Sequence, residues 1–207
     1  MQNPSPTTVE LVLASGSPRR RRLLEDLGVA FRVRPVHADE SPLADESIDE
    51  MVLRLACDKA RADSKPGSLV LAADTMVMLD GLGLGKPDNA VQARAMLRRL
   101  AGRTHEVITG VALLDVDREK LVSEVEVSQV SIAEIDDGEI DWYVATGEPL
   151  DKAGAYAIQG LGALFVRSVN GNYSNIVGLP LPLTQALFRR LGFDLRDFQT
   201  GLASSTE

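Results

Sequence analysis

A short, mostly apolar run that stops at a hydroxyl-rich turn and leads into a cationic segment constrains this chain more than any other feature. Residues 9–14 suit a buried strand, and Pro18 suits the first turn of a helix, where a missing N–H costs nothing. Free N–H groups at a helix start attract anions, hydroxyls donate to phosphate oxygens, and a guanidinium binds phosphate through paired hydrogen bonds. The predicted phosphate contacts are Ser15, Ser17, Arg19 and Arg20.

The same stretch has an alternative interpretation. Four consecutive arginines at 19–22 are also typical of an N-capped surface helix whose cations are solvated. The preceding strand and the two hydroxyls, Ser15 and Ser17, favour the phosphate interpretation because they converge on the helix N-terminus.

Charge and composition narrow the class of ligand. The chain has 207 residues and a net charge of -8, whereas a nonspecific nucleic-acid binder usually carries a basic domain or stripe. Local cations in an acidic chain therefore favour a small anion, and we expect no nucleic-acid partner. A single cysteine, Cys57, excludes an internal disulfide, and two histidines are too few for a structural zinc site.

The chain gives no sign of export or of membrane insertion. Residues 1–8 are polar and contain proline, unlike a secretory signal, and no apolar run approaches the length of a membrane span. We therefore expect a cytoplasmic protein with no membrane partner.

Hydrophobic periodicity predicts alternating strands and helices. The opening is a β-α-β unit with a strand at 9–14, a helix at 18–27 and a strand at 31–36. Alternation over 106–133 predicts two strands joined around 115–120, so the α/β sheet must be mixed rather than purely parallel. Further strands are expected at 69–79 and 164–169, and further helices at 47–63, 89–100, 138–146 and 183–191. Ser47 and Glu50 have the spacing of a capping box at the start of the helix at 47–63.

No repeat or long linker divides the chain. We expect a flexible N-terminal tail at 1–8, one α/β domain at 9–194 and a mobile C-terminal tail at 195–207.

Common nucleotide-binding and hydrolase motifs are absent. In the stretch 80–87, Asp80 replaces the first glycine of a P-loop and Pro87 replaces its metal-binding hydroxyl. The stretch 160–162 lacks the third glycine and the ribose-binding acid of a dinucleotide site. The Gly-x-Ser-x-Gly nucleophile elbow of serine hydrolases is also absent. His105 is predicted to have a structural role.

Charged residues near element ends are the remaining catalytic candidates. Asp74 is expected to end an apolar strand, where a carboxylate is costly unless it is paired, hydrogen-bonded or bound to metal. It could hold Mg²⁺ or Mn²⁺ and orient or deprotonate a water, with Glu40 as a second oxygen ligand. Lys59 and Lys86 could neutralise phosphate charge. Each candidate also has a structural alternative. Asp74 could simply cap the end of a strand, Glu40 could belong to a solvated acidic loop, and each lysine could be a surface residue.

Six groups of residues occur in order along 11–191: Ser15-Gly16-Ser17-Pro18-Arg19-Arg20 with Leu23-Leu24, Arg54-Leu55-Ala56 with Lys59-Ala60, Ala73-Asp74-Thr75, Lys86-Pro87, Gly102-Arg103-Thr104-His105, and Gly178-Leu179-Pro180. Together they resemble the Maf family of nucleoside triphosphate pyrophosphatases. The resemblance implies an elongated mixed α/β fold with two lobes around a central cleft, similar to inosine triphosphatase-type enzymes. It also implies a cytoplasmic enzyme that uses a divalent cation to release a nucleoside monophosphate and pyrophosphate, and a homodimer by analogy.

The resemblance assigns roles to individual residues. Asp74 becomes the proton acceptor and Glu40 a metal ligand. The stretch 151–160 is similar to the branch that acts on dTTP and UTP, whereas the 7-methylguanosine triphosphate branch has a glutamate in the region of Gln159. An amide there offers both a donor and an acceptor, which match the edge of uracil or thymine. The implied triphosphate contacts are Ser15, Arg19, Lys59 and Lys86, and the specificity positions are Arg19, Thr75 and Gln159.

The sequence therefore predicts a pyrophosphatase for dTTP, UTP and modified pyrimidine triphosphates, with water attacking the α phosphorus. Two alternatives remain open. One is a nucleotide-binding regulator of septum formation and cell division, which the family resemblance suggests. The other is the same reaction on a different base, such as 7-methylguanosine triphosphate.

Overall fold

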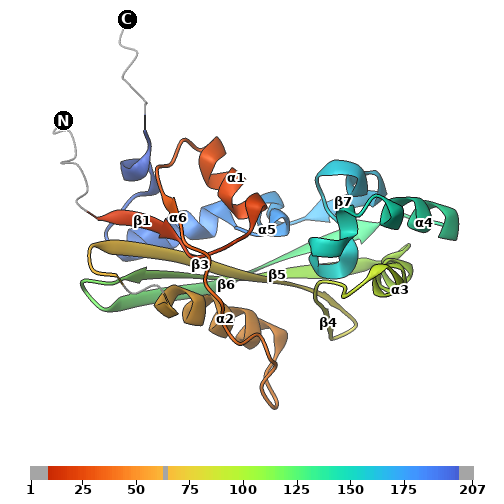
Figure 1. Ribbon diagram of the computed structural model, residues 1–207, viewed down its shortest axis with the longest axis horizontal. Helices are drawn as coiled ribbons and strands as arrows, with labels where there is room; N and C mark the ends of the chain where they lie inside the picture. The colour runs from red at the N-terminus through yellow and green to blue at the C-terminus, as the bar shows by residue number, and fades with distance from the viewer. Residues whose placement is uncertain (1–8, 63–64, 201–207) are drawn as a thin grey trace, which may run out of the picture.

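The β-α-β opening predicted from the sequence is present. It consists of β1 (Glu10–Leu13), α1 (Pro18–Asp26) and β2 (Arg32–Val33), and β1 pairs in parallel with β2 and with β3 (Ser68–Leu79). These elements are seen in a computed structural model, which describes residues 9–62 and 65–200 (Figure 1). The predicted tail at 1–8 lies outside these ranges.

The predicted hairpin supplies the antiparallel part of the sheet. It is formed by β5 (Thr104–Asp115) and β6 (Lys120–Ile132), in which Asp115 pairs with Lys120. β5 also pairs with β3, β6 pairs with β7 (Val166–Asn170), and the short β4 (Leu82–Leu84) pairs with the end of β3. The sheet order is β2-β1-β3-β5-β6-β7, so the predicted mixed α/β fold is confirmed.

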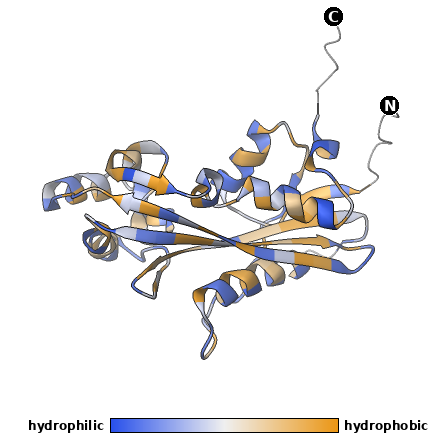
Figure 2. Cartoon of the chain, turned by 180° about the vertical axis from the view of Figure 1, so that it is seen from behind, coloured by the Kyte–Doolittle hydropathy of each residue, from blue (hydrophilic) through white to orange (hydrophobic). Residues whose placement is uncertain are grey.

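Helices cover both faces of this sheet. Besides α1, the helices are α2 (Ile48–Ala62), α3 (Ala90–Leu100), α4 (Asp137–Ala145), α5 (Tyr173–Val177) and α6 (Leu181–Arg190), with 3-10 turns η1 (Glu148–Asp151), η2 (Ala153–Ala155), η3 (Gly160–Phe165) and η4 (Leu195–Phe198). In Figure 1, α2 lies on one face, α1, α5 and α6 lie on the other, and α3 and α4 lie at the end remote from β1. Figure 2 shows hydrophobic residues concentrated on the strands and alternating with hydrophilic residues along α2.

Burial along β3 explains why its first half reads as a continuous apolar run. Leu69 and Leu71 face the core cluster beneath α1 and α6, while Val70 and Ala72 face the cluster beneath α2. Alternate side chains of a strand point to opposite faces, so covering both faces makes every position apolar. Val77 belongs to a third cluster at the far end of the sheet, with α3 and α4.

The start of α2 follows the local sequence. Ser47 and Glu50 form the expected capping box: the Ser47 N–H donates to Glu50 Oε2 at 2.9 Å, and the Glu50 N–H donates to Ser47 Oγ at 3.3 Å. The helix is thereby fixed at its N-terminus before it crosses the sheet.

No helix in residues 9–62 and 65–200 is both long enough and apolar enough to span a membrane.

Three predicted boundaries were wrong. The strand expected at 31–36 is only Arg32–Val33, because Pro35 has no N–H to extend the ladder. The strand expected at 164–169 begins at Val166, since η3 occupies 160–165.

The expected C-terminal tail was also placed too early. Residues 195–198 form η4, whose Leu195 and Phe198 are each 7% exposed and belong to the cluster beneath α1 and α6. Apolar side chains in this segment bury against the core, so the folded unit extends beyond residue 194. The remainder of that tail, 201–207, lies outside the described residues.

Candidate active site

The turn after β1 has the geometry predicted for a helix start that faces an anion. Ser17 is the N-cap of α1, and its Oγ accepts a hydrogen bond from the Arg20 N–H at 3.4 Å. Ser15 Oγ accepts one from the Ser17 N–H at 3.2 Å, and Pro18 occupies the first turn. The hydroxyls and the helix N-terminus therefore lie together, as the sequence indicated.

A cavity of about 670 Å³ opens at this helix end. Its walls come from distant parts of the chain: the β1–α1 turn, the segment before α2, α2 itself, β3, the β4–α3 segment, and residues 151–159. Every predicted site residue lines it: Ser15, Ser17, Arg19, Arg20, Glu40, Lys59, Asp74, Thr75, Lys86 and Gln159.

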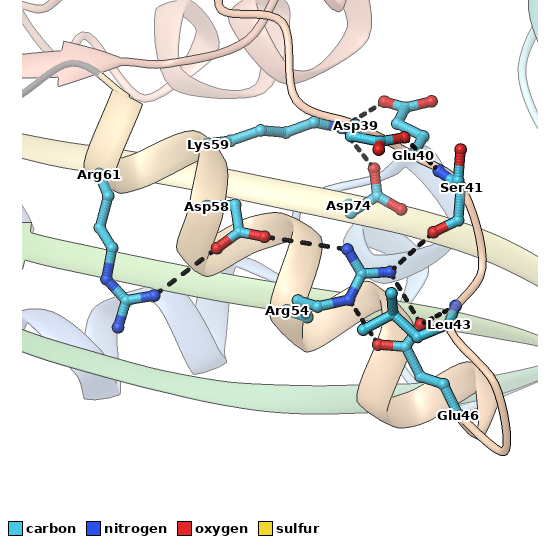
Figure 3. A network of polar contacts seen from close by, with 10 residues as sticks. All are labelled: Asp39, Glu40, Ser41, Leu43, Glu46, Arg54, Asp58, Lys59, Arg61 and Asp74. Atoms are coloured by element: carbon cyan, nitrogen blue, oxygen red, sulfur yellow. Dashed lines mark hydrogen bonds and ion pairs between the residues drawn. The ribbon is translucent and has the colours of Figure 1, made fainter.

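The Lys59 ammonium lies between two carboxylates at the cavity wall. Lys59 Nζ is 2.7 Å from Glu40 Oε1 and 2.6 Å from Asp74 Oδ1 (Figure 3). The Lys59 and Asp74 side chains are 11% and 13% exposed, whereas Glu40 is 63% exposed. Because it is held by Lys59, the Glu40 carboxyl has a pKa below its usual value. The structure thus brings together three residues from the segment before α2, from α2 itself and from β3, which are at most 34 positions apart in sequence.

Asp74 does not end its strand as expected. It lies in the middle of β3, opposite Gly110 of β5, and the strand continues for five more residues to Leu79. The backbone pairing with β5 is continuous through Asp74, and Asp74 lines the cavity at this point. A charged side chain is tolerated there because Lys59 supplies a hydrogen-bonded counter-charge.

Arg20 is a partly buried cross-link in the cavity wall. Its guanidinium donates to Gly178 O at 2.7 Å, Thr75 Oγ1 at 3.0 Å and Ser15 Oγ at 3.2 Å. Burial lowers the pKa of Arg20 below its usual value. Thr75 Oγ1 also lies 3.0 Å from Thr109 Oγ1, so two of the predicted binding residues are already bound to the protein. Their contact with a ligand stays a prediction.

Arg19 reaches across the cavity to the opposite wall. Its Nη1 donates to Asp151 Oδ2 at 3.0 Å, and Lys152 Nζ donates to Asp151 Oδ1 at 2.6 Å. Asp151 and Lys152 line the cavity but were given no role from the sequence. The available signal was their place in the stretch 151–160, which carries the branch resemblance.

Gln159 lies at the rim, next to a turn organised by Glu148. The Glu148 carboxylate accepts hydrogen bonds from the Leu161 N–H at 3.0 Å, the Gly162 N–H at 2.9 Å and the Tyr143 hydroxyl at 2.9 Å. Gln159 is exposed just before this turn, with its side chain at the cavity lining. Sequence reasoning missed Glu148, which lies outside the stretch 151–160.

The cavity is positively charged inside an acidic protein. Its charged lining leaves a net charge of +2, against -8 for the whole chain. This balance suits a small polyanion, as predicted. The lining cations are Arg19, Arg20, Lys59, Lys86 and Lys152, and the lining carboxylates are Glu40, Asp74 and Asp151.

The donor set fits a hard divalent cation that is shared with a phosphate ligand. In residues 9–62 and 65–200, no group of three or more His, Cys, Asp or Glu side chains is placed to hold a metal by itself. Mg²⁺, however, is usually bound by one or two carboxylates plus substrate phosphates and water. Glu40 and Asp74 already converge on one cation, the Lys59 ammonium, so they supply such a pair.

His105 is structural, as predicted. It is 2% exposed, and its Nε2 lies 2.8 Å from the Tyr156 hydroxyl. The ring supports Tyr156, which itself lines the cavity, but His105 does not.

Comparison with known proteins identifies the family of this chain. A family model described as Maf-like protein matches residues 10–191. The chain is 56% identical over 191 residues to a dTTP/UTP pyrophosphatase of Anaeromyxobacter dehalogenans strain 2CP-C, covering 89% of this chain and 95% of that protein. It is 52% identical over 187 residues to one of Myxococcus xanthus (89% and 94%), and 47% identical over 188 residues to one of Symbiobacterium thermophilum (90% and 96%). With the whole domain matched and the cavity lined as its motifs predicted, the chain belongs to the Maf family.

Proposed function

We propose that this protein hydrolyses dTTP and UTP, and modified pyrimidine triphosphates, to the nucleoside monophosphate and pyrophosphate. The observation that carries the proposal is the Lys59 ammonium held between Glu40 and Asp74 in a cavity of net positive charge. The printed activity of the relatives, at 47–56% identity, supports it.

Different residues activate the attacking water and stabilise the leaving group. A water attacks the α phosphorus, its proton passes to the Asp74 carboxylate, and the bond to the bridging oxygen of the β phosphate breaks. Lys59 fixes the orientation of Asp74 through their 2.6 Å contact. Lys86 and Arg19 lie around the same cavity, where their charges stabilise the departing pyrophosphate.

A divalent cation, Mg²⁺ or Mn²⁺, completes this proposal. Glu40 and Asp74 would hold it, and it would polarise the phosphate oxygens. The Lys59 ammonium prepares the site because it keeps both carboxylates pointed at one place.

Gln159 gives a physical basis for selecting uracil and thymine. Its side chain lines the rim of the cavity and offers both a donor and an acceptor. A glutamate at this position could only accept, so it would not match the alternating donor and acceptor edge of these bases.

The test is pyrophosphate release from dTTP, UTP, CTP, GTP, ITP and 7-methylguanosine triphosphate, each with Mg²⁺ or Mn²⁺. We expect cleavage of dTTP and UTP. Because a general base contributes about 10²–10⁴-fold, Asp74→Asn should lower kcat by that factor with little change in KM. Gln159→Glu should weaken or redirect base selection.

The outcomes separate the rival functions. Cleavage of another base would keep the chemistry and refute the specificity. Tight binding without release from any nucleotide would favour the regulator of septum formation. Near-normal turnover of Asp74→Asn would remove the proton-acceptor role from Asp74.

Three further expectations accompany the proposal. A homodimer follows from family analogy and is tested by light scattering. Lack of nucleic-acid binding is supported by the net charge of -8 and is tested by a gel-shift titration. A cytoplasmic location follows from the family resemblance and is tested by cell fractionation.

A further inference from the structure

Glu40 is carried by a long irregular segment. Residues 34–47, between β2 and α2, contain no helix or strand. The Glu40 side chain is 63% exposed and reaches the cavity through its contact with Lys59. Its position therefore depends on what holds the backbone of this segment against the rest of the protein.

Arg54 supplies that hold from α2. Its Nε and Nη2 donate to the two oxygens of Glu46 at 2.5 and 2.8 Å, as paired hydrogen bonds (Figure 3). Its Nη2 also donates to the carbonyl of Ser41, the residue after Glu40, at 3.2 Å. One guanidinium thus binds the segment at both ends of the stretch 41–46.

The Glu46 end of this contact is well enclosed. The Glu46 side chain is 8% exposed and that of Arg54 is 23% exposed. Glu46 also accepts the Leu43 N–H at 3.2 Å, which closes the stretch on itself. The hydrogen bonds from Arg54 hold the pKa of the Glu46 carboxyl below its usual value, so the pair stays charged at neutral pH.

Arg54 has no place in the cavity lining, whereas Lys59 of the same helix does. The two residues are five positions apart, about 7.5 Å along a helix axis. A single rigid helix therefore holds Glu40 through Lys59 and the backbone beside Glu40 through Arg54.

We propose that Arg54 is a positioning residue, which clamps the segment 41–46 to α2 so that Glu40 presents its carboxylate beside Asp74 to the divalent cation and triphosphate. The role of Glu40 in this statement rests on the proposed function. The clamp itself is a property of the protein alone and has its own test.

The first experiment measures how well the backbone amides of the segment are protected, and it does not depend on enzymatic turnover. In hydrogen exchange of the full chain, Arg54→Gln should speed exchange of amides in 38–46 by about tenfold or more, because the segment loses its fixed partner. Arg54→Lys keeps the charge but loses the paired geometry, so it should speed exchange as well. Arg98→Gln, which removes an exposed ion pair between Arg98 of α3 and Asp137 of α4, is the matched control and should change nothing in this segment. Unchanged exchange in Arg54→Gln would overturn the proposal.

The second arm measures whether Arg54 acts through Glu40. Loss of a residue that orients a metal ligand typically costs about 10–100-fold in metal affinity, so Arg54→Gln should raise the Mg²⁺ concentration for half-maximal dTTP cleavage by that factor. In a Glu40→Gln background, adding Arg54→Gln should cost less than about twofold, because the orientated group is already gone. Effects that multiply instead would overturn the proposal.

Glu46→Gln weakens the same contact by changing the partner of Arg54, and it replaces Arg54→Gln in both experiments if that variant fails to fold. It should reproduce the faster exchange and the higher Mg²⁺ requirement. If the wild-type protein releases no pyrophosphate from any nucleotide, the proposed function fails. Exchange of the segment, together with Mn²⁺ binding followed by electron paramagnetic resonance, then decides the clamp independently.

Discussion

Gly110 marks a close approach between α2 and the sheet, and Gly110→Ala tests it. A Cβ at this position would lie 2.4 Å from Val52 O, 2.5 Å from Val52 C and 2.7 Å from Leu53 N. All three are backbone atoms of α2, so no side-chain rotation relieves the overlap. Overpacking costs about 1–3 kcal/mol, and a rigid backbone neighbour places the cost of this variant at about 3 kcal/mol.

The assay is unfolding by urea and by heat. For a chain of this size, each kcal/mol shifts Tm by about 2–4 °C, so Gly110→Ala should lower Tm by roughly 6–12 °C. Gly85→Ala is the matched control because its Cβ would meet nothing within 4 Å, and we expect a change within about 0.5 kcal/mol. A Gly110→Ala protein as stable as the wild type would refute the contact between α2 and β5.

The same variant links packing to chemistry. Gly110 pairs with Asp74 across β3 and β5, and α2 carries Lys59. Moving α2 away from Gly110 therefore lengthens the contact between Lys59 and Asp74. We expect folded Gly110→Ala protein at 25 °C to lose kcat for dTTP, whereas an unchanged kcat would show that the helix keeps its place.

Burial lowers the pKa of His105 from 6.5 to about 4, so between these values the unfolded chain binds a proton that the folded chain does not. The free energy of unfolding should therefore fall by up to about 3 kcal/mol as pH decreases from 6.5 to 4, and His105→Phe should flatten this slope in urea titrations. Glu148→Gln weakens the hydrogen bonds that shape the turn after Gln159, so the kcat/KM ratio of UTP to CTP should fall about tenfold; an unchanged ratio would contradict a link to base selection. Lys59→Met leaves Asp74 without its counter-charge and should lower kcat/KM for dTTP by about 10²–10³-fold, and a value near that of the wild type would exclude Lys59 from the site.

Helix starts could be predicted from the sequence because they depend on interactions between neighbouring residues. Ser47 and Glu50 are three residues apart and form the capping box that the sequence indicated. Pro18 and Ser17 likewise open α1, because helix starts depend on a few neighbouring residues. The charged candidates could be listed from chemistry and family resemblance, and the fold then places all of them around one cavity.

Contacts between distant residues could not be predicted in this way. Arg19 and Asp151 are 132 positions apart, and no periodicity or spacing links them. The approach of Gly110 to Val52 is equally invisible, since a glycine in a strand does not reveal which element lies above it. Phe198 falls in the stretch 195–207 expected to be a mobile tail, yet its ring packs against Phe188 of α6.

The position of Asp74 in the middle of β3, rather than at its end, shows how the cavity is placed in the fold. Up to Ala73, β3 is covered on both faces, and from Val77 it enters the cluster formed with α3 and α4. Asp74 and Thr75 lie between the parts of β3 that belong to these cores, and both line the cavity. In this chain the two polar residues that interrupt the apolar strand therefore mark a site in mid-strand. Because both cores share β3 and β5, the sheet itself fixes the distance between the two walls of the cavity.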